Sequence, residues 1–128
     1  MQESDLPGCA EICRHVHGWD RTNELRDSLK MFRPFVLLRN GRVVAYASAP
    51  TFWILNHGVA QTEQDMADLL LAAGQANAEP ISILVPVRRA SFFRWCIAAG
   101  LRVVKPMTLM AMGQYNDPRG AFYSSVVY

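Results

Sequence analysis

The sequence predicts an α/β domain with a mixed sheet of about six strands, mostly antiparallel, with a parallel pair at its centre and about four flanking helices. A strand-like run followed by a helix-like run occurs twice in succession, over residues 52–76 and 81–100. Two strands joined through a helix lie parallel in one sheet. Earlier, Asn40-Gly41 separates two β-rich runs, which is the strongest local hairpin signal. With 128 residues, the chain is expected to form a single domain over residues 1–128.

Two helices are expected before the hairpin. Ser4 or Asp5 can cap the first, because their side chains accept hydrogen bonds from free backbone N–H groups, and Pro7 is tolerated in a first turn. Gly18 is expected to end this helix, and a second helix follows over about residues 20–30. The first helix has an apolar face at helical spacing, formed by Leu6, Ala10, Cys13 and Val16.

After the hairpin, the chain is expected to form strand, helix, strand, helix, strand and strand. The strand over residues 52–60 precedes a helix over 62–76, which begins at a capping box between Thr62 and Asp65. A buried strand from residue 81 stops at Pro86, and a short amphipathic helix follows it and ends before Gly100. A turn over 116–120 separates the last two strands. The ligand crevice is expected between the two central strands, which are the parallel ones.

Composition and charge argue against several classes of protein. The chain is 51% hydrophobic and 19% charged, with a net charge of +2, and no basic run interleaves with aromatic residues. We therefore expect no nucleic-acid partner. No run approaches the roughly 18 uncharged residues of a membrane span, so no membrane association is expected. Three cysteines without paired spacing predict reduced thiols in a cytoplasmic protein, and the spacing of the three histidines predicts no metal site.

Five stretches of the sequence resemble the GNAT superfamily of acyl-CoA-dependent N-acyltransferases, and together they cover nearly the whole chain. One of them, residues 52–70, resembles the family's fourth strand and central helix. The hairpin ending in VVAYAS is similar to the family's G-x-x-V-G-Y strand pair, and LVPVRRASFFRWCIAAGLRVV to its fifth strand, the next helix and the strand after it. The closing MGQYNDPRGAFYSSVVY resembles the last strands of the C-terminal domain in tandem bacterial GNAT proteins. The first helices also resemble that domain.

The resemblance implies that acetyl-CoA, or another acyl-CoA, binds as co-substrate and that a small-molecule amine accepts the acyl group. The pantetheine arm would pair with backbone groups of Val59 and Ala60, and the phosphates would lie at the start of the following helix and near Arg89. The residues expected to contact acyl-CoA are Val59, Ala60, Gln61, Thr62, Gln64 and Arg89.

Two residues are candidates for the proton transfers of such a reaction. His57 stands at the end of the fourth strand and is a candidate base for the attacking amine. Cys96 occupies the position where many GNAT proteins carry a tyrosine that protonates the thiolate of CoA. The alternative interpretations are that Cys96 is a small buried core residue and that His57 is an ordinary polar residue at a strand end.

The departures from the family pattern keep a second hypothesis open. GNAT proteins typically have glycines before the central helix, where backbone N–H groups bind the pyrophosphate, and here Gln64 and Met66 stand at those positions. Glu63 and Asp65 add negative charge to the same turn. The alternative is a non-catalytic module of the GNAT fold that binds a ligand or a protein. A third hypothesis is a homodimer that covers the face which a sister domain would cover.

Overall fold

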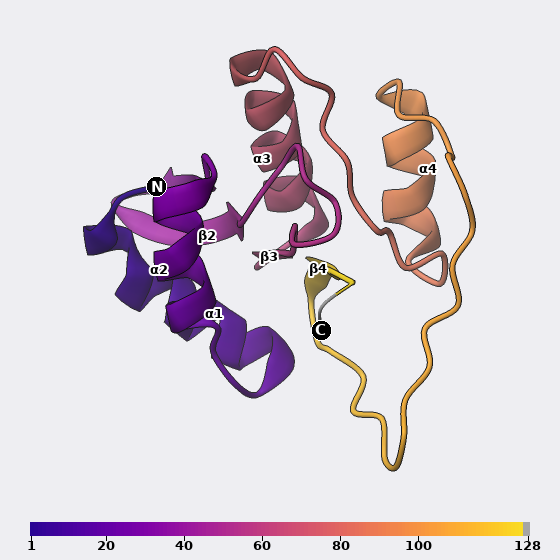
Figure 1. The fold of residues 1–128 in the computed structure, drawn as a ribbon, viewed down its shortest axis with the longest axis horizontal. Helices are drawn as coiled ribbons and strands as arrows, with labels where there is room; N and C mark the ends of the chain where they lie inside the picture. The colour runs from indigo at the N-terminus through magenta and orange to yellow at the C-terminus, as the bar shows by residue number, and fades with distance from the viewer. Residues whose placement is uncertain (127–128) are drawn as a thin grey trace.

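The computed structural model describes residues 1–126, which form helices on both faces of one antiparallel sheet (Figure 1). The strand order in this sheet is β1-β2-β3-β4, and every neighbouring pair is antiparallel. The α/β class is therefore confirmed. The helices are η1 (Glu3–Asp5), α1 (Leu6–His17), α2 (Thr22–Met31), α3 (Glu63–Ala76) and α4 (Ala90–Ala98); the strands are β1 (Phe35–Arg39), β2 (Arg42–Ala47), β3 (Gly58–Ala60) and β4 (Ala121–Tyr123).

The helices and the hairpin form where local sequence signals predict them. Gly18 ends α1 in the left-handed conformation with φ 89°, which glycine adopts without strain. Asn40 and Gly41 both have positive φ, 50° and 73°, and join β1 to β2 in the turn that the Asn-Gly pair predicts. Gly100 follows α4 with φ 96°. These three local predictions are confirmed, but the predicted cap of the first helix is not made, because Asp5 at the N-cap of α1 makes no side-chain capping hydrogen bond.

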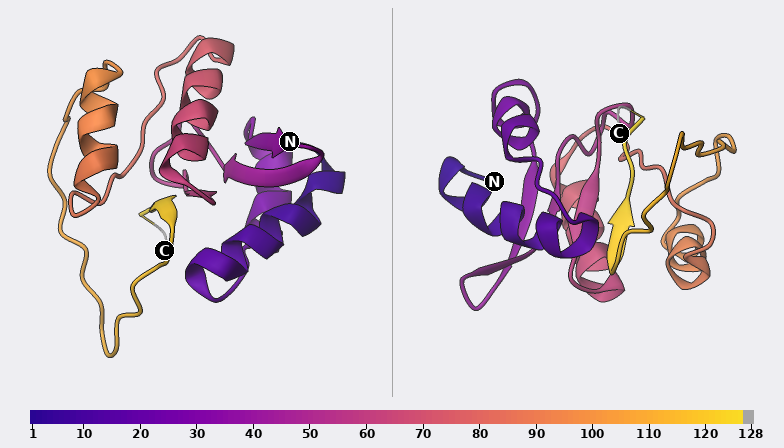
Figure 2. Two further views of the ribbon diagram at one scale, coloured as in Figure 1. Left: turned by 180° about the vertical axis from the view of Figure 1, so that it is seen from behind. Right: turned by 90° about the horizontal axis from the view of Figure 1, so that it is seen from below.

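The sheet has two separate cores, one on each face. On one face α1 and α2 pack against β2 and β3, and on the other face α3 and α4 pack against the same sheet (Figure 2). The first core contains Leu6, Ile12, Leu25, Tyr46, Val59 and Phe122. The second contains Met66, Leu69, Leu70, Phe92, Cys96 and Tyr123.

The predicted parallel pair at the centre of the sheet is wrong. β4 lies beside β3, and Ser124 just after it makes an isolated antiparallel bridge to Leu84. The segment around Leu84 is thus the next neighbour of β4, and β4 stands between the two runs that were expected to be parallel neighbours. A strand from the far end of the chain has taken that place, which local sequence patterns do not reveal.

The predicted count of about six strands is also wrong, since four strands form within the described residues. Residues 51–55 make turns instead of extending β3, with the N–H of Asn56 donating to the carbonyl of Phe52 over 3.0 Å. Residues 101–120 contain no helix or strand. Pro106 and Pro118 cannot donate a backbone hydrogen bond, and Pro106 interrupts the segment where a strand was expected.

Candidate functional site

His57 immediately precedes β3. Buried hydrogen bonds with Tyr46 and Ser48 hold it in place. Its Nε2 lies 2.8 Å from the hydroxyl of Tyr46. Its backbone N–H donates to Oγ of Ser48 over 2.8 Å, and its carbonyl accepts from the backbone N–H of Ser48 over 3.0 Å. The imidazole is 2% exposed. A residue held in this way on three sides is well ordered but does not face solvent.

The environment keeps His57 uncharged. Burial, followed by the positive charges of Arg21 and His17, holds the pKa of His57 well below its ordinary value. Burial also raises the pKa of Tyr46 well above its ordinary value. A neutral imidazole is the form that a general base requires, but the base must also reach the proton that it removes. Here Nε2 of His57 already contacts the hydroxyl of Tyr46.

Val59 and Ala60, the expected partners of pantetheine, lie in the interior of the sheet. On one side they pair with Tyr46 and Ala45 of β2. On the other side they pair with Phe122 and Ala121 of β4. The main-chain groups that would hold the arm of acyl-CoA are therefore directed at neighbouring strands on both sides.

Side chains lock β4 in this position. A Cβ atom added to Gly58 would lie 2.3 Å from the ring of Tyr123, so the ring rests directly on the glycine. The hydroxyl of Tyr123 donates to Oδ1 of Asn56 over 3.2 Å, and Nδ2 of Asn56 donates to the carbonyl of Ser82 over 2.9 Å. Asn56 is fully buried. It joins β4 to the segment on its other side, and no sequence signal singled it out.

Gln61, Thr62 and Gln64 come together at the exposed start of α3, and the predicted cap by Thr62 is confirmed as the first of the two hydrogen bonds of a capping box. Oγ1 of Thr62 accepts from the N–H of Asp65 over 3.1 Å and donates to its carboxylate over 2.6 Å. Arg39 contributes an ion pair to Asp65 at 2.7 Å. Although burial acts in the opposite direction, the hydrogen bonds from Thr62 and Arg39 hold the pKa of Asp65 below its ordinary value. This carboxylate is therefore charged at neutral pH, within the first turn of the helix.

Other side chains occupy the rest of this helix start. Nε2 of Gln64 donates to Asp68 over 2.8 Å, and Oγ of Ser91 donates to the carboxylate of Glu63 over 2.6 Å. The second contact ties the start of α4 to the start of α3. Two carboxylates in this turn favour the bare helix and oppose a diphosphate at the same place.

Arg89 faces the chain rather than open solvent. Its Nη2 donates to the carbonyl of Pro118 over 3.1 Å, and its guanidinium lies 5.7 Å from the centre of the Phe122 ring. The guanidinium thus holds the segment that leads into β4. This is a structural role that the sequence did not indicate.

Cys96 and His57 are not brought together. Cys96 lies in the core between α3, α4 and the sheet, where burial raises the pKa of its thiol to about 11. His57 contacts Tyr46, which belongs to the core on the opposite face. A thiol with a raised pKa stays protonated at neutral pH, but Cys96 is only 3% exposed and belongs to the core on the face opposite Tyr46.

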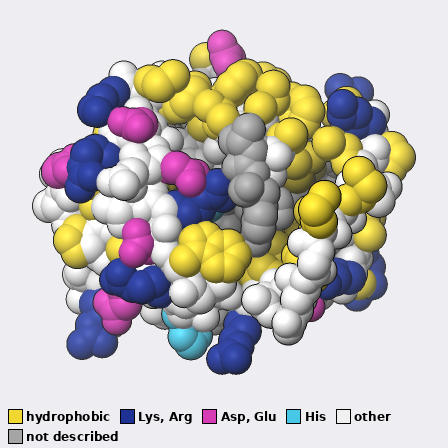
Figure 3. Space-filling view, turned by 60° about the horizontal axis from the view of Figure 1, so that its bottom comes forward, with side chains coloured by type: hydrophobic (Ala, Val, Ile, Leu, Met, Phe, Trp, Pro, Cys, Tyr) yellow, Lys and Arg dark blue, Asp and Glu magenta, His cyan; other side chains and the backbone are white. Residues whose placement is uncertain are grey.

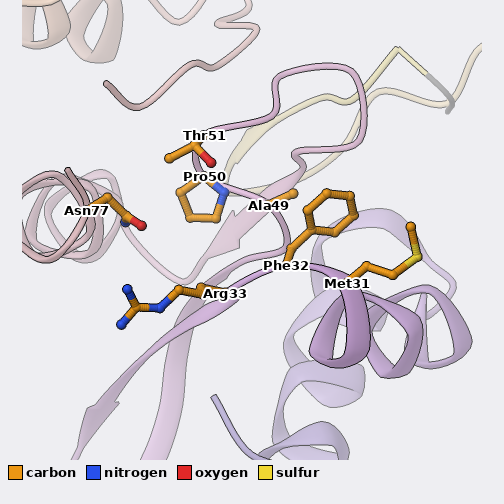
Figure 4. A pocket seen from close by; sticks show the side chains of 7 residues that line it. All are labelled: Met31, Phe32, Arg33, Ala49, Pro50, Thr51 and Asn77. Carbon is orange, nitrogen blue, oxygen red and sulfur yellow. The ribbon is translucent and has the colours of Figure 1, made fainter. Parts of the chain in front are cut away.

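Two open hollows of about 200 and 360 Å³ share Phe32 and Arg33, and neither is lined by a residue predicted to bind acyl-CoA or to transfer a proton. The smaller one is bordered by the end of α2, the turn after β2 and the end of α3, and Figure 4 shows Phe32, Pro50, Thr51 and Asn77 around it. Three distant segments form this hollow, and no sequence signal indicated it. Within residues 1–126, no group of three or more metal-binding side chains is close enough to hold an ion.

Comparisons of the chain with models of protein families, with curated proteins and with solved structures find no match. None of the described helices is both long enough and apolar enough to cross a membrane.

Proposed function

We propose that the chain is a non-catalytic module of the GNAT-like type that acts by association with protein, without binding acyl-CoA. The observation that carries this proposal is the position of β4. It pairs with Val59 and Ala60 along the edge where the resemblance places the pantetheine arm. The GNAT-like assignment itself rests on the motifs in the sequence and on the order of two helices, hairpin, strand and helix.

The candidate chemical groups support the same conclusion. His57 and Cys96 are buried on opposite faces of the sheet, so one amine and one thioester cannot lie between them. The start of α3 carries Glu63 and Asp65 where a diphosphate would need uncommitted N–H groups. The candidate proton donor and the candidate base are thus buried in the interior of the protein. The candidate phosphate site is occupied by neighbouring side chains.

The second candidate is an acyltransferase that transfers an acetyl group from acetyl-CoA to a small-molecule amine. One observation favours it: β4 is only three residues long, and Gln61, Thr62 and Gln64 lie exposed beside it. Displacement of β4 would free one edge of β3 for pantetheine. The cost would include breaking the contact between Tyr123 and Asn56 and exposing the Tyr123 ring.

Thermal unfolding with and without acetyl-CoA separates the two candidates. A ligand that binds the folded state at about 100 times its Kd stabilises that state by about 2.7 kcal/mol, which raises the unfolding midpoint by several degrees. We expect no change of midpoint with acetyl-CoA or CoA at about 1 mM, which is the upper end of the usual range of KM values. ATP serves as the control for non-specific binding of a polyanion.

A rise with acetyl-CoA that ATP does not produce would contradict the proposal. The variant Gln64→Glu then provides a further check, because a third carboxylate at the start of α3 repels a diphosphate bound there. Loss of the rise in this variant would place the bound diphosphate at the start of α3, as the acyltransferase candidate requires.

A further inference from the structure

The segment over residues 101–117 is the most exposed part of the chain and has no regular structure. In Figure 1 it runs beside α4, extends to the lower edge of the molecule and returns to β4. The backbone groups of residues 102–117 make no hydrogen bond to any other backbone group of the residues that the structure describes. A structureless stretch of this length is uncommon inside a compact domain and is usually either a functional segment or a linker.

This segment carries apolar side chains rather than the polar ones of an ordinary loop. Six of its large apolar residues are at least half exposed, namely Val103, Val104, Met107, Leu109, Met110 and Met112. Figure 3 shows hydrophobic side chains gathered over the upper and right-hand parts of one face of the molecule, with most acidic side chains at its left. Single exposed apolar residues are normal in a monomer, but a large gathering of apolar side chains on one face is typical of an interaction site.

These six residues are spaced as in a strand whose two faces are both apolar and both buried. Three of the six stand at odd positions and three at even positions. Successive side chains of a strand point to opposite faces, so both faces of this segment would be apolar. If this segment joined the edge of the sheet in its own copy, α4 would cover only one of its two apolar faces.

The same molecule has a segment beside β4, residues 81–85, that is paired on one side only, although it forms a single isolated bridge and not a full strand. In residues 81–85, the N–H of Ser82 donates to Pro50, and the carbonyl of Leu84 accepts from Ser124. The alternate residues Ile81, Ile83 and Val85 make no hydrogen bond within the described chain, although their side chains pack partly against the core of α3 and α4. This alternation is that of an unpaired sheet edge, which readily accepts another strand.

We propose that the chain forms a homodimer in which residues 103–112 of each copy pair with the free edge at residues 81–85 of the other. Each copy supplies one strand and one edge, so a single twofold axis satisfies both. The second copy also covers the apolar face that α4 leaves open. A standard interface buries about 800 Å² per partner. The six apolar side chains, each at least half exposed in one copy, are available to form it.

This proposal rests on the proposed function, because it names the partner of the module. Its test is light scattering coupled to size-exclusion chromatography of the full chain, without acetyl-CoA, over a hundredfold range of concentration. We expect a mass twice the 14.4 kDa of one chain. The variant Val104→Lys/Met110→Lys should weaken dimerisation at least tenfold, because both side chains are nearly fully exposed in one copy and would be buried in the dimer.

The matched control is Leu38→Lys/Leu71→Lys, which adds the same charge at two half-exposed leucines on β1 and α3. It should remain a dimer, and circular dichroism should show that both variants are folded. A wild-type monomer over the whole range would overturn the proposal, as would equal weakening by the control pair. Slow amide exchange of residues 103–112 in a monomer would also overturn it, since the segment would then pair within its own copy. Because no acyl-CoA is present, failure of this test leaves the proposed absence of acyl-CoA binding untouched.

Discussion

The hydroxyl of Tyr123 donates a buried hydrogen bond to Oδ1 of Asn56, 67 residues earlier in the chain. Asn56 also accepts from the N–H of Ala49 and donates to the carbonyl of Ser82. One carboxamide therefore joins the turn after β2, the segment around Leu84 and β4. This contact fixes the strand that fills the expected crevice.

Replacing Asn56 by alanine should destabilise the fold by about 2–4 kcal/mol, because the three groups that it satisfies would be left buried without partners. Urea unfolding followed by circular dichroism measures this free energy. Asn116→Ala, at an exposed position, is the matched control and should change stability by less than about 0.5 kcal/mol. Equal stability of the two variants would mean that Asn56 does not hold β4.

Gly58→Ala should be destabilising, and the effect should depend on Tyr123. The added methyl group would overlap the Tyr123 ring, and overpacking of this kind costs about 1–3 kcal/mol. In a Tyr123→Ala background the penalty should largely disappear, since the clashing ring is absent. Gly74→Ala has open space around its Cβ within α3 and should instead stabilise the protein by about 0.5–1 kcal/mol.

Stability should fall as pH decreases below about 6.5, the pKa of histidine in an unfolded chain. The folded state lowers the pKa of both His57 and His17, the latter to about 4 through burial. Between these values the unfolded chain binds more protons, so the free energy of unfolding rises with pH and is lost on acidification. Each histidine contributes a slope of up to about 1.4 kcal/mol per pH unit.

Urea unfolding at several pH values between 4.5 and 7.5 tests this dependence. His57→Gln should lower the slope of the free energy of unfolding against pH by the equivalent of about one bound proton. His17→Gln should lower the remaining slope. An unchanged slope in His57→Gln would show that its imidazole is accessible and protonates in the folded state. That result would revive its candidacy as a base.

The three cysteines should react slowly with a disulfide reagent in the folded protein and quickly in urea. All three are buried, and burial raises the pKa of Cys9 to about 12 and that of Cys96 to about 11. A thiol must lose its proton before it attacks such a reagent. Absorbance at pH 8 follows the reaction. Rapid labelling of one thiol that disappears in Cys96→Ser would contradict a core role for this residue.

The sequence predicted those parts of the fold that depend on neighbouring residues. Gly18, Asn40-Gly41 and the box between Thr62 and Asp65 act within a few residues, so the helix ends, the hairpin turn and the start of α3 could all be predicted. The order of the helices and of β1 to β3 follows from such signals, whereas the strands predicted from residue 81 and after Gly100 do not form in the described part of the chain.

The place of β4 could not be predicted in this way. Phe122 pairs with Val59 across more than 60 residues, and that pairing depends on the Tyr123 ring resting on Gly58. A single sequence gives no pattern for a contact of this range. For the same reason the burial of His57 behind Tyr46 was not visible, because a lone histidine carries no periodicity that reveals its surroundings.

Amide hydrogen exchange of β4, followed by NMR, tests the central claim most directly, because that claim is that β4 stays paired with β3 and closes the acyl-CoA crevice. We expect the amides of β4 that bond to β3 to be as protected as those between β2 and β3, and to keep that protection when acetyl-CoA is added at about 1 mM. Rapid exchange of β4 in the free protein, or loss of its protection on adding acetyl-CoA, would contradict the account.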